Sequence, residues 1–400
     1  MEYLRENIST LVSRRPEQFK MGLGTAAAMV PLAILILKPH PRELAIMIFK
    51  VFGTIPLAIL SHFTREKALQ KRSLKQTIVV SIFRVMIQNA SLWRLRQVLP
   101  MLGRAVAFQK GYTSKQFNSQ WQNETVKKTW KGIWVGNGVG ATNVDDPRAF
   151  DNVDVVIIHV HGGGFTSGTA TEGLTLFVEL VKQFEKRHNI RAFVFSLDYF
   201  LAPEHRFPSA RDQIIDIYTD HVLNKLQIPA QKIVFSGDSA GGNLALVAAI
   251  KIRDESHSRN VPLPSALILS SPWVSLLRTS ASYTANVNRD FITFGEIDSQ
   301  IENYIKNTGA KPTDPAISPL FAENFADLPP MVVAVGNHEM FNDDIRALVE
   351  KVKSAGVKAE LVDNEIGVHD WLLSEDLAGG EKRWLDGIAK LVDFVVSSRR

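Results

Sequence analysis

The sequence contains no cysteine. This absence excludes disulfide bonds, zinc sites with cysteine ligands and a thiol nucleophile. A long run of Lys and Arg with interleaved aromatic residues is also missing, since the 46 basic and 41 acidic side chains are scattered along the chain. Nucleic acid is therefore not an expected partner. Neither an internal repeat nor a low-complexity segment is present, so the 400 residues are expected to form one large α/β domain with an appended segment.

Residues 1–61 differ from the rest of the chain and form the first predicted segment. Residues 21–37 (MGLGTAAAMVPLAILIL) carry no charge and are just long enough to span a thin bilayer as a helix. Residues 44–60 are also apolar, but Lys50 and Pro56 make them a poorer span. KPHPRE follows the first run without a small-residue cleavage site, which argues against a removed signal peptide. We predict a membrane anchor; the alternative is a pair of amphipathic helices that cap an active site.

The charges that flank residues 21–37 predict the orientation of such an anchor. More basic residues precede it (Arg5, Arg14, Arg15 and Lys20) than directly follow it (Lys38 and Arg42). By the positive-inside rule, the N-terminus would be cytosolic and the remainder lumenal, as in the endoplasmic reticulum. Asn89-Ala-Ser and Asn123-Glu-Thr would then be acceptors for N-glycosylation.

Residues 62–125 are predicted to be a helical linker or cap, and residues 126–400 a catalytic α/β domain. Apolar, β-branched runs begin near residue 126: TWKGIWVGN as an early edge strand, then VDVVIIHV, AFVFSLDY, KIVFSG, SALILSSPW and PPMVVAVG. Such runs are typical of strands buried on both faces of a parallel sheet. Helical patterns separate them at residues 175–187, 210–226, 242–253 and 343–355. The alternation predicts a mostly parallel sheet with helices on both faces, and ligands bind such sheets beyond the carboxyl ends of the strands.

HGGGF (residues 161–165) follows the run that ends at Val160. Three successive glycines cost backbone entropy, so a flexible turn is the weaker explanation. The stronger one is that unshielded backbone N–H groups converge to stabilise an oxyanion. His159 and His161 form an H-x-H pair, but no further histidine or carboxylate stands at ligand spacing, so we predict no metal site. No cofactor is predicted either.

GDSAGG (residues 237–242) stands where an apolar strand pattern changes into a helical one. Ser239 is flanked by small residues, as a nucleophile held on a strained strand-to-helix turn requires. Ala240 would start the helix and direct its N–H towards the same oxyanion. A serine hydroxyl needs a base to accept its proton, so a histidine and an acid are expected further along the chain.

Glu339 directly follows the strand that ends at Gly336 and is the predicted acid. Asp343 is its main rival; it and Asp344 fall in the following helical pattern, where acidic residues favour the N-terminus of a helix. His369 lies in a loop after the last short strand and completes the order serine, acid, histidine. His338 is expected to be a solvated loop residue.

HGGGF, DYFLAPEHRFPSA, GDSAGGN, SPW, GNHEMFNDD and GVHDW, in this order, resemble the hormone-sensitive-lipase family of α/β-hydrolases, which includes fungal steryl acetyl hydrolases and arylacetamide deacetylases. The likeness extends from about Trp130 to the C-terminus. It implies an α/β-hydrolase fold with a helical cap, a Ser239–Glu339–His369 triad, and an oxyanion hole built from His161, Gly162, Gly163, Gly164 and Ala240. In it, Gly163, Gly164 and Ala240 would supply N–H groups and His161 would brace the loop. Many members carry Asp at the position of Glu339, which leaves Glu339 or Asp343 as the acid.

These residues together predict a serine esterase that removes a short acyl group, such as acetate, from a lipophilic alcohol, for example a sterol or a specialised metabolite. Amide deacetylation is chemically close, because the same acyl-enzyme would form. The other class is a non-catalytic small-molecule binder, since some relatives keep the pocket after losing a catalytic residue. The pocket is expected between the N-terminal helices and an insertion around residues 275–325, with Trp273, Phe291 and Phe294 at its walls.

Overall fold

The computed structural model describes residues 41–64, 69, 71–109, 112, 118–125, 128–256 and 260–399. The predicted anchor at residues 21–37 lies outside them. The chain divides into two compact units, Met1–Ala90 and Ser91–Arg400. No helix within the described ranges is both long and apolar enough to cross a membrane.

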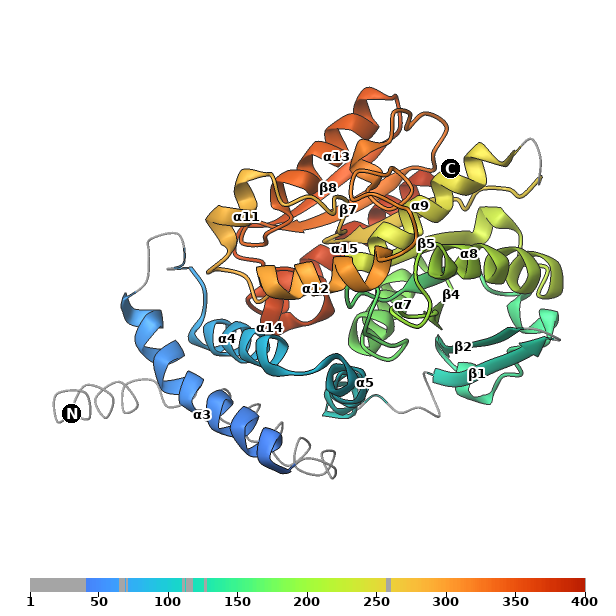
Figure 1. The fold of residues 1–400 in the computed structure, drawn as a ribbon. Coiled ribbons are helices and arrows are strands. Elements are labelled where there is room, and N and C mark those ends of the chain that lie inside the picture. Colours follow the sequence, from blue (N-terminus) through green and yellow to red (C-terminus); the bar gives the residue numbers. More distant parts are fainter. Residues whose placement is uncertain are drawn as a thin grey trace, which may run out of the picture. The chain divides into compact units, whose positions relative to one another are not determined.

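The first unit contains two described helices, α3 (Pro41–Thr64) and α4 (Leu74–Asn89) (Figure 1). Ala58 of α3 packs against Ile78 and Ile82 of α4 in a small apolar cluster. The Ser73 hydroxyl accepts a hydrogen bond from the Gln76 N–H at 3.1 Å, so a side chain satisfies one of the donors left over at the start of α4. Other apolar side chains of α3 are exposed: Phe49, Phe52, Leu57, Leu60 and Phe63.

The second unit is built on an eight-stranded sheet in the order β1-β2-β4-β3-β5-β6-β7-β8. The strands are β1 (Asn118–Thr125), β2 (Lys128–Val135), β3 (Val155–Val160), β4 (Ala192–Asp198), β5 (Ile233–Asp238), β6 (Ala266–Ser270), β7 (Met331–Gly336) and β8 (Ala359–Asn364). β3 to β8 run parallel, whereas β2 pairs antiparallel with both β1 and β4. All residues of β3, β5, β6 and β7 are buried, which explains their nearly continuous apolar sequences.

Helices cover both faces of this sheet (Figure 1). The described helices of this unit include α5 (Leu92–Gln109), α7 (Leu174–His188), α8 (Ser209–Asp216), α9 (Ser239–Asp254), α11 (Ala281–Asn286), α12 (Phe294–Ile305), α13 (Asn342–Ser354), α14 (Glu375–Ala378) and α15 (Glu381–Ser398). α7 packs with α15, and α8 packs with α9. The predicted mostly parallel α/β architecture is confirmed.

Two local predictions need correction. The run TWKGIWVGN is β2, but it is not the edge strand, because β1 pairs along its outer side. β1 has the polar sequence NSQWQNET and joins the sheet through backbone hydrogen bonds. No apolar run in the sequence therefore predicts this strand. The helix expected at residues 210–226 is α8 followed by a π-helical segment, Ile217–Lys225.

β1 and α5 precede residue 126, the expected start of the catalytic domain, yet they belong to the same compact unit as the rest of the sheet.

Candidate active site

Ser239 lies on a sharp turn between β5 and α9. The strand ends at Asp238 and the helix begins at Ser239, whose backbone has a left-handed φ of 49°. This conformation is costly for a residue with a Cβ, so strain is stored at this position. Ser239 is 6% exposed. The predicted nucleophile therefore occupies a strained elbow at the carboxyl edge of the sheet.

The glycines on either side of Ser239 allow the close approach of three backbone segments. A Cβ on Gly237 would lie 2.4 Å from the carbonyl carbon of Gly241. A Cβ on Gly241 would lie 2.0 Å from the carbonyl oxygen of Val160, at the end of β3. Real Cβ atoms do not approach backbone atoms this closely. The G-x-S-x-G spacing is thus a steric requirement of the junction between β3, β5 and α9.

The glycine loop after β3 passes directly beside the elbow. A Cβ on Gly162 would lie 3.1 Å from the Ser239 Cβ. The Gly162 N–H donates a hydrogen bond to the Asp238 Oδ2 at 2.9 Å, so it holds the loop in place and is not available to a substrate. Gly163 and Gly164 have φ values of 96° and 60°, which only glycine adopts readily. The oxyanion donors are therefore expected to be the N–H groups of Gly163, Gly164 and Ala240, and not that of Gly162.

His161 and Tyr199 brace the glycine loop from behind. The His161 Nδ1–H donates to the Gly162 carbonyl at 2.8 Å, and its ring stacks on Tyr199 with centroids 4.3 Å apart. The Tyr199 hydroxyl donates to the His161 carbonyl at 3.0 Å. Burial lowers the pKa of His161, so its ring is neutral at physiological pH. These contacts match the bracing role predicted for His161.

Asp238 organises the other histidine of the H-x-H pair. Its Oδ1 accepts a hydrogen bond from the His159 Nε2 at 3.0 Å, and the His159 Nδ1 lies 3.1 Å from the Ser236 hydroxyl. His159 and His161 therefore bind different partners. Asp238 is the variable residue before the serine in the motif, which is why the sequence alone did not mark it as functional.

His369 and Glu339 approach each other from the loops that follow β8 and β7. The His369 Nδ1 lies 3.6 Å from the Glu339 Oε2, a distance longer than a hydrogen bond. Glu339 is completely buried, and burial raises its pKa to about 8, while the Ser271 side chain opposes the rise. Burial also lowers the pKa of His369 to about 4, so its imidazole is neutral and able to accept a proton.

The rival acid, Asp343, forms hydrogen bonds with Ser282 and not with His369. Its Oδ2 accepts a hydrogen bond from the Ser282 N–H at 2.7 Å, and its own N–H donates to the Ser282 hydroxyl at 3.2 Å. Asp343 thus ties α13 to the start of α11. Of the two candidate acids, Glu339 is the one that the structure places beside His369.

Asp370 and His338 also belong to the loops that carry His369 and Glu339. The Asp370 Oδ2 lies 3.2 Å from the His369 Nε2, so carboxyl groups flank both ring nitrogens. Burial raises the pKa of Asp370 well above its usual value. The prediction that His338 is solvated was wrong, since the residue is buried at 6% exposure. Its backbone N–H donates to the Gly367 carbonyl at 2.9 Å and joins the loop of Glu339 to the loop of His369.

The insertion between β6 and β7 covers the glycine loop. The Phe165 ring stacks on Tyr304 of α12 with centroids 3.9 Å apart and also faces Trp273 at 5.5 Å. A Cβ on Gly164 would lie 2.0 Å from the side-chain amide of Gln300, so this α12 side chain rests on the loop. Phe291 lies 5.8 Å from the His369 ring, whereas Phe294 packs under Arg278. Trp273 and Phe291 are therefore brought to the predicted site.

The fold and these motifs match a known family model. The model described as the alpha/beta hydrolase fold matches residues 157–373, a segment that contains Gly162, Ser239, Glu339 and His369. The chain belongs to the α/β-hydrolase family. This result confirms the predicted fold class.

Relatives of this α/β-hydrolase include several with esterase names. An "Esterase" of Acinetobacter venetianus is 35% identical over 215 residues, covering 54% of this chain and 66% of the relative. An "Acetyl-hydrolase" of Streptomyces hygroscopicus is 29% identical and covers 54% and 67%. The "Versiconal hemiacetal acetate esterase" of Emericella nidulans is 29% identical and covers 48% and 65%. The chain thus spans about two thirds of the length of these relatives.

Solved structures agree on the fold of this α/β-hydrolase. A hormone-sensitive lipase from a metagenome library superimposes with a TM-score of 0.63, at 23% identity, covering 88% of this chain and 98% of that one. The hormone-sensitive-lipase homologue EstE7 gives a TM-score of 0.64 at 23% identity, covering 81% and 99%. These are structures of the family that the motifs predicted.

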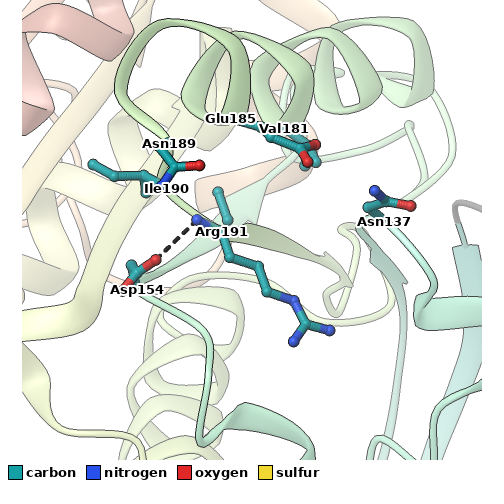
Figure 2. Close-up of a pocket in the computed structure, with 8 residues that line it drawn as sticks. Asn137, Asp154, Val181, Glu185, Asn189, Ile190 and Arg191 are labelled. Carbon is teal, nitrogen blue, oxygen red and sulfur yellow. Dashed lines mark hydrogen bonds between the residues drawn. The ribbon is translucent and has the colours of Figure 1, made fainter.

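A cavity of ≈ 360 Å³ lies at the opposite edge of the sheet of this α/β-hydrolase (Figure 2). It is lined by residues at the starts of β3 and β4 and at the end of α7, among them Asp154, Glu185, Asn189 and Arg191. The Arg191 N–H donates to the Asp154 carboxylate at 2.9 Å. Since Ser239 follows the carboxyl end of β5, this cavity is separate from the predicted catalytic residues.

Proposed function

We propose that this α/β-hydrolase is a serine esterase that cleaves short-chain, acetyl-type esters of lipophilic alcohols. One observation carries the proposal: Ser239 is held on a left-handed elbow beside the glycine loop, at the same edge of the sheet as the His369–Glu339 pair. Relatives named esterase, acetyl-hydrolase and acetate esterase support an ester with a short acyl group.

In the proposed reaction, His369 accepts the proton of the Ser239 hydroxyl as its oxygen attacks the acyl carbon. The resulting oxyanion accepts hydrogen bonds from the N–H groups of Gly163, Gly164 and Ala240; one such donor typically contributes about 10²- to 10³-fold to the rate. His369 then protonates the departing alcohol. Water then attacks the acyl-enzyme while His369 accepts its proton, and the imidazolium returns that proton to the Ser239 oxygen as the carboxylic acid departs. When Glu339 is ionised, its carboxylate orients the imidazole and stabilises the charged form.

Two aromatic side chains beside His369 support a lipophilic alcohol. Phe341 and Phe291 lie with their ring centroids 5.0 and 5.8 Å from the imidazole. A sterol or a specialised metabolite fits this character, and one relative is named for a hemiacetal acetate. Acetates of such alcohols are therefore the substrates to try after simple esters.

The test is hydrolysis of p-nitrophenyl esters from acetate to palmitate by the wild type, Ser239→Ala and a control, Ser354→Ala, at the exposed end of α13. Activity that peaks at short chains, is lost in Ser239→Ala and is retained in Ser354→Ala would support the proposal. A profile that rises towards palmitate would replace the esterase with a lipase. Turnover of acetanilides but not of esters would favour amide deacetylation. No turnover, together with no labelling of Ser239 by a fluorophosphonate, would favour a non-catalytic binder.

We also propose that α3 places the protein on a lipid surface from which such substrates could be taken. Large apolar side chains of α3 are exposed, among them Phe49 at 79% and Leu57 at 66%. A flat apolar helix face of this kind can enter the boundary between headgroups and acyl chains. Flotation with phosphatidylcholine vesicles should recover the wild type and much less of Phe49→Glu/Leu57→Glu. Equal recovery of both proteins would refute a role for α3.

Lumenal placement of the protein predicts that it carries N-linked glycans. Endoglycosidase H should then change its electrophoretic mobility, and Asn89→Gln should reduce the change.

A further inference from the structure

Asp290 is a buried carboxylate that the proposed reaction does not use. It lies between α11 and α12, in the insertion that follows β6, and is only 1% exposed. Burying a carboxylate is costly unless hydrogen bonds compensate for the lost water. Its partners therefore show what the fold gains from it.

The Asp290 carboxylate accepts three backbone hydrogen bonds. One comes from its neighbour Phe291, whose N–H lies 2.8 Å from Oδ1. The second comes from the His369 N–H, 3.2 Å from the same oxygen. The third comes from the Met340 N–H, 2.9 Å from Oδ2. Because Met340 directly follows Glu339, one side chain holds the backbone of the predicted acid and that of the predicted base.

This link connects two loops that begin on different strands. Glu339 follows β7 and His369 follows β8, so their separation of 3.6 Å depends on how the two loops are held together. Hydrogen bonds to an ionised acceptor are stronger than those between neutral groups. Asn286 reinforces one side only: its Nδ2 donates to the Glu339 carbonyl at 2.8 Å. Asp290 reaches both loops.

The charge of Asp290 also acts on His369. Burial lowers the pKa of His369, and the carboxylates of Asp290 and Asp238 oppose this effect. The other ionisable groups that face the imidazole are Glu339 on its Nδ1 side and Asp370 on its Nε2 side. Burial raises the pKa of Asp290 itself to about 6, so its charge opposes the effect on His369 only above that pH.

We propose that Asp290 is a positioning residue of this hydrolase, whose carboxylate aligns the loops of Glu339 and His369. The proposal rests on the proposed serine esterase function. It assigns to the insertion between β6 and β7 a role in building the catalytic pair, in addition to covering the site.

The decisive variant is Asp290→Asn, which keeps the shape but removes the charge and one of the two acceptor oxygens. Asp314→Asn is the matched control, because Asp314 also accepts a backbone N–H, from Ala316 at 2.9 Å, but in a different loop. The pH dependence of kcat/KM for p-nitrophenyl acetate and of fluorophosphonate labelling of Ser239 would be measured. For Asp290→Asn we expect kcat to fall about 10- to 100-fold with little change in KM. Because burial raises the pKa of Asp290 to about 6, the wild type should lose activity as Asp290 gains a proton near pH 6, and Asp290→Asn should lack this step in its pH profile.

Asp290→Glu keeps the negative charge but moves the carboxylate by one methylene group. It should lower kcat through the displaced loops but retain a step of this kind in its pH profile. An Asp290→Asn variant with a wild-type kcat and a wild-type pH profile would overturn the positioning role alone, provided that the wild type shows Ser239-dependent turnover. Without that turnover and without labelling, the proposed function fails and the positioning role fails with it.

A measurement on the wild type covers the case in which neither variant folds. In a crystal structure, the Asp290 carboxylate should lie within hydrogen-bonding distance of both the His369 N–H and the Met340 N–H. A carboxylate that binds only one of these loops would overturn the proposal.

Discussion

Asp238 holds Gly162: its Oδ2 accepts the Gly162 N–H at 2.9 Å, while its Oδ1 accepts the His159 Nε2–H at 3.0 Å. Because Asp238 directly precedes Ser239, one side chain couples the nucleophile's elbow to the glycine loop. The position of the oxyanion donors relative to Ser239 thus depends on a residue outside the predicted triad.

Asp238→Ala should impair both stability and catalysis. Two buried donors would lose their acceptor, at a cost of about 1–3 kcal/mol each in the free energy of unfolding. The loosened glycine loop should lower kcat at least about 100-fold. Urea denaturation and ester hydrolysis measure the two effects, and Asp254→Ala, at the exposed end of α9, is the control. A loss below about 1 kcal/mol with kcat within threefold of the wild type would refute the coupling.

Substitutions of the two candidate acids should have clearly different effects on kcat. Glu339→Gln removes the carboxylate beside His369 and should lower kcat roughly 10³- to 10⁴-fold, as loss of a triad acid does elsewhere. Asp343→Asn disturbs only the link to Ser282 and should retain kcat within about tenfold. The reverse order of the two losses would show that Asp343 is the acid.

Glu339 should also make stability depend on pH. Burial raises its pKa from 4.5 to about 8, so the folded protein holds a proton that the unfolded chain releases between these pH values. The resulting contribution to the free energy of unfolding is present below pH 4.5 and is lost as the pH rises to about 8. Between pH 5 and 8, the wild type should therefore lose on the order of 2–4 kcal/mol relative to Glu339→Gln. Parallel stability curves in denaturant titrations of the two proteins would contradict the raised pKa.

Gly241→Ala should prevent the strand and helix from meeting. Its Cβ would lie 2.0 Å from the Val160 carbonyl oxygen, so we expect a loss of about 3 kcal/mol or more in stability, or insoluble protein. Gly295→Ala is the matched control, since a Cβ there would meet nothing within 4 Å and Ala favours a helix by up to about 1 kcal/mol. Similar melting temperatures for the two variants would show that α9 can move away from the end of β3 to accommodate the added Cβ.

Arg96 should anchor α5 to the loops of the active site. Its guanidinium donates to the carbonyls of Thr166 and Ala202 at 2.7 and 2.6 Å and to the Glu204 carboxylate at 2.8 Å. Arg96→Ala should cost about 1–3 kcal/mol, and Arg96→Lys should not restore it, because one ammonium cannot reproduce the planar fork of donors. Arg104→Ala, at an exposed site of the same helix, should change stability by less than about 0.5 kcal/mol. Full stability of Arg96→Lys in denaturant titrations would contradict this assignment.

The strands were predictable where burial decided their composition. β3, β5 and β7 lie between two layers of helices, so their sequences are apolar on both faces. β1 was missed for the opposite reason: it lies at the edge of the sheet, and its polar side chains carry no signal of pairing.

The amino-acid sequence by itself determined the alternation of strands and helices, the elbow glycines and the order of serine, acid and histidine. Backbone sterics and burial impose these patterns on nearby residues, so they can be recognised in short stretches. Only the tertiary structure decided that Glu339 faces His369 while Asp343 caps α11, although four positions separate them after the same strand. It also decided that Asp238 and Asp290 join loops 76 and 79 residues away. Hydrogen bonds over such distances depend on how the strands assemble, and no local pattern contains that information.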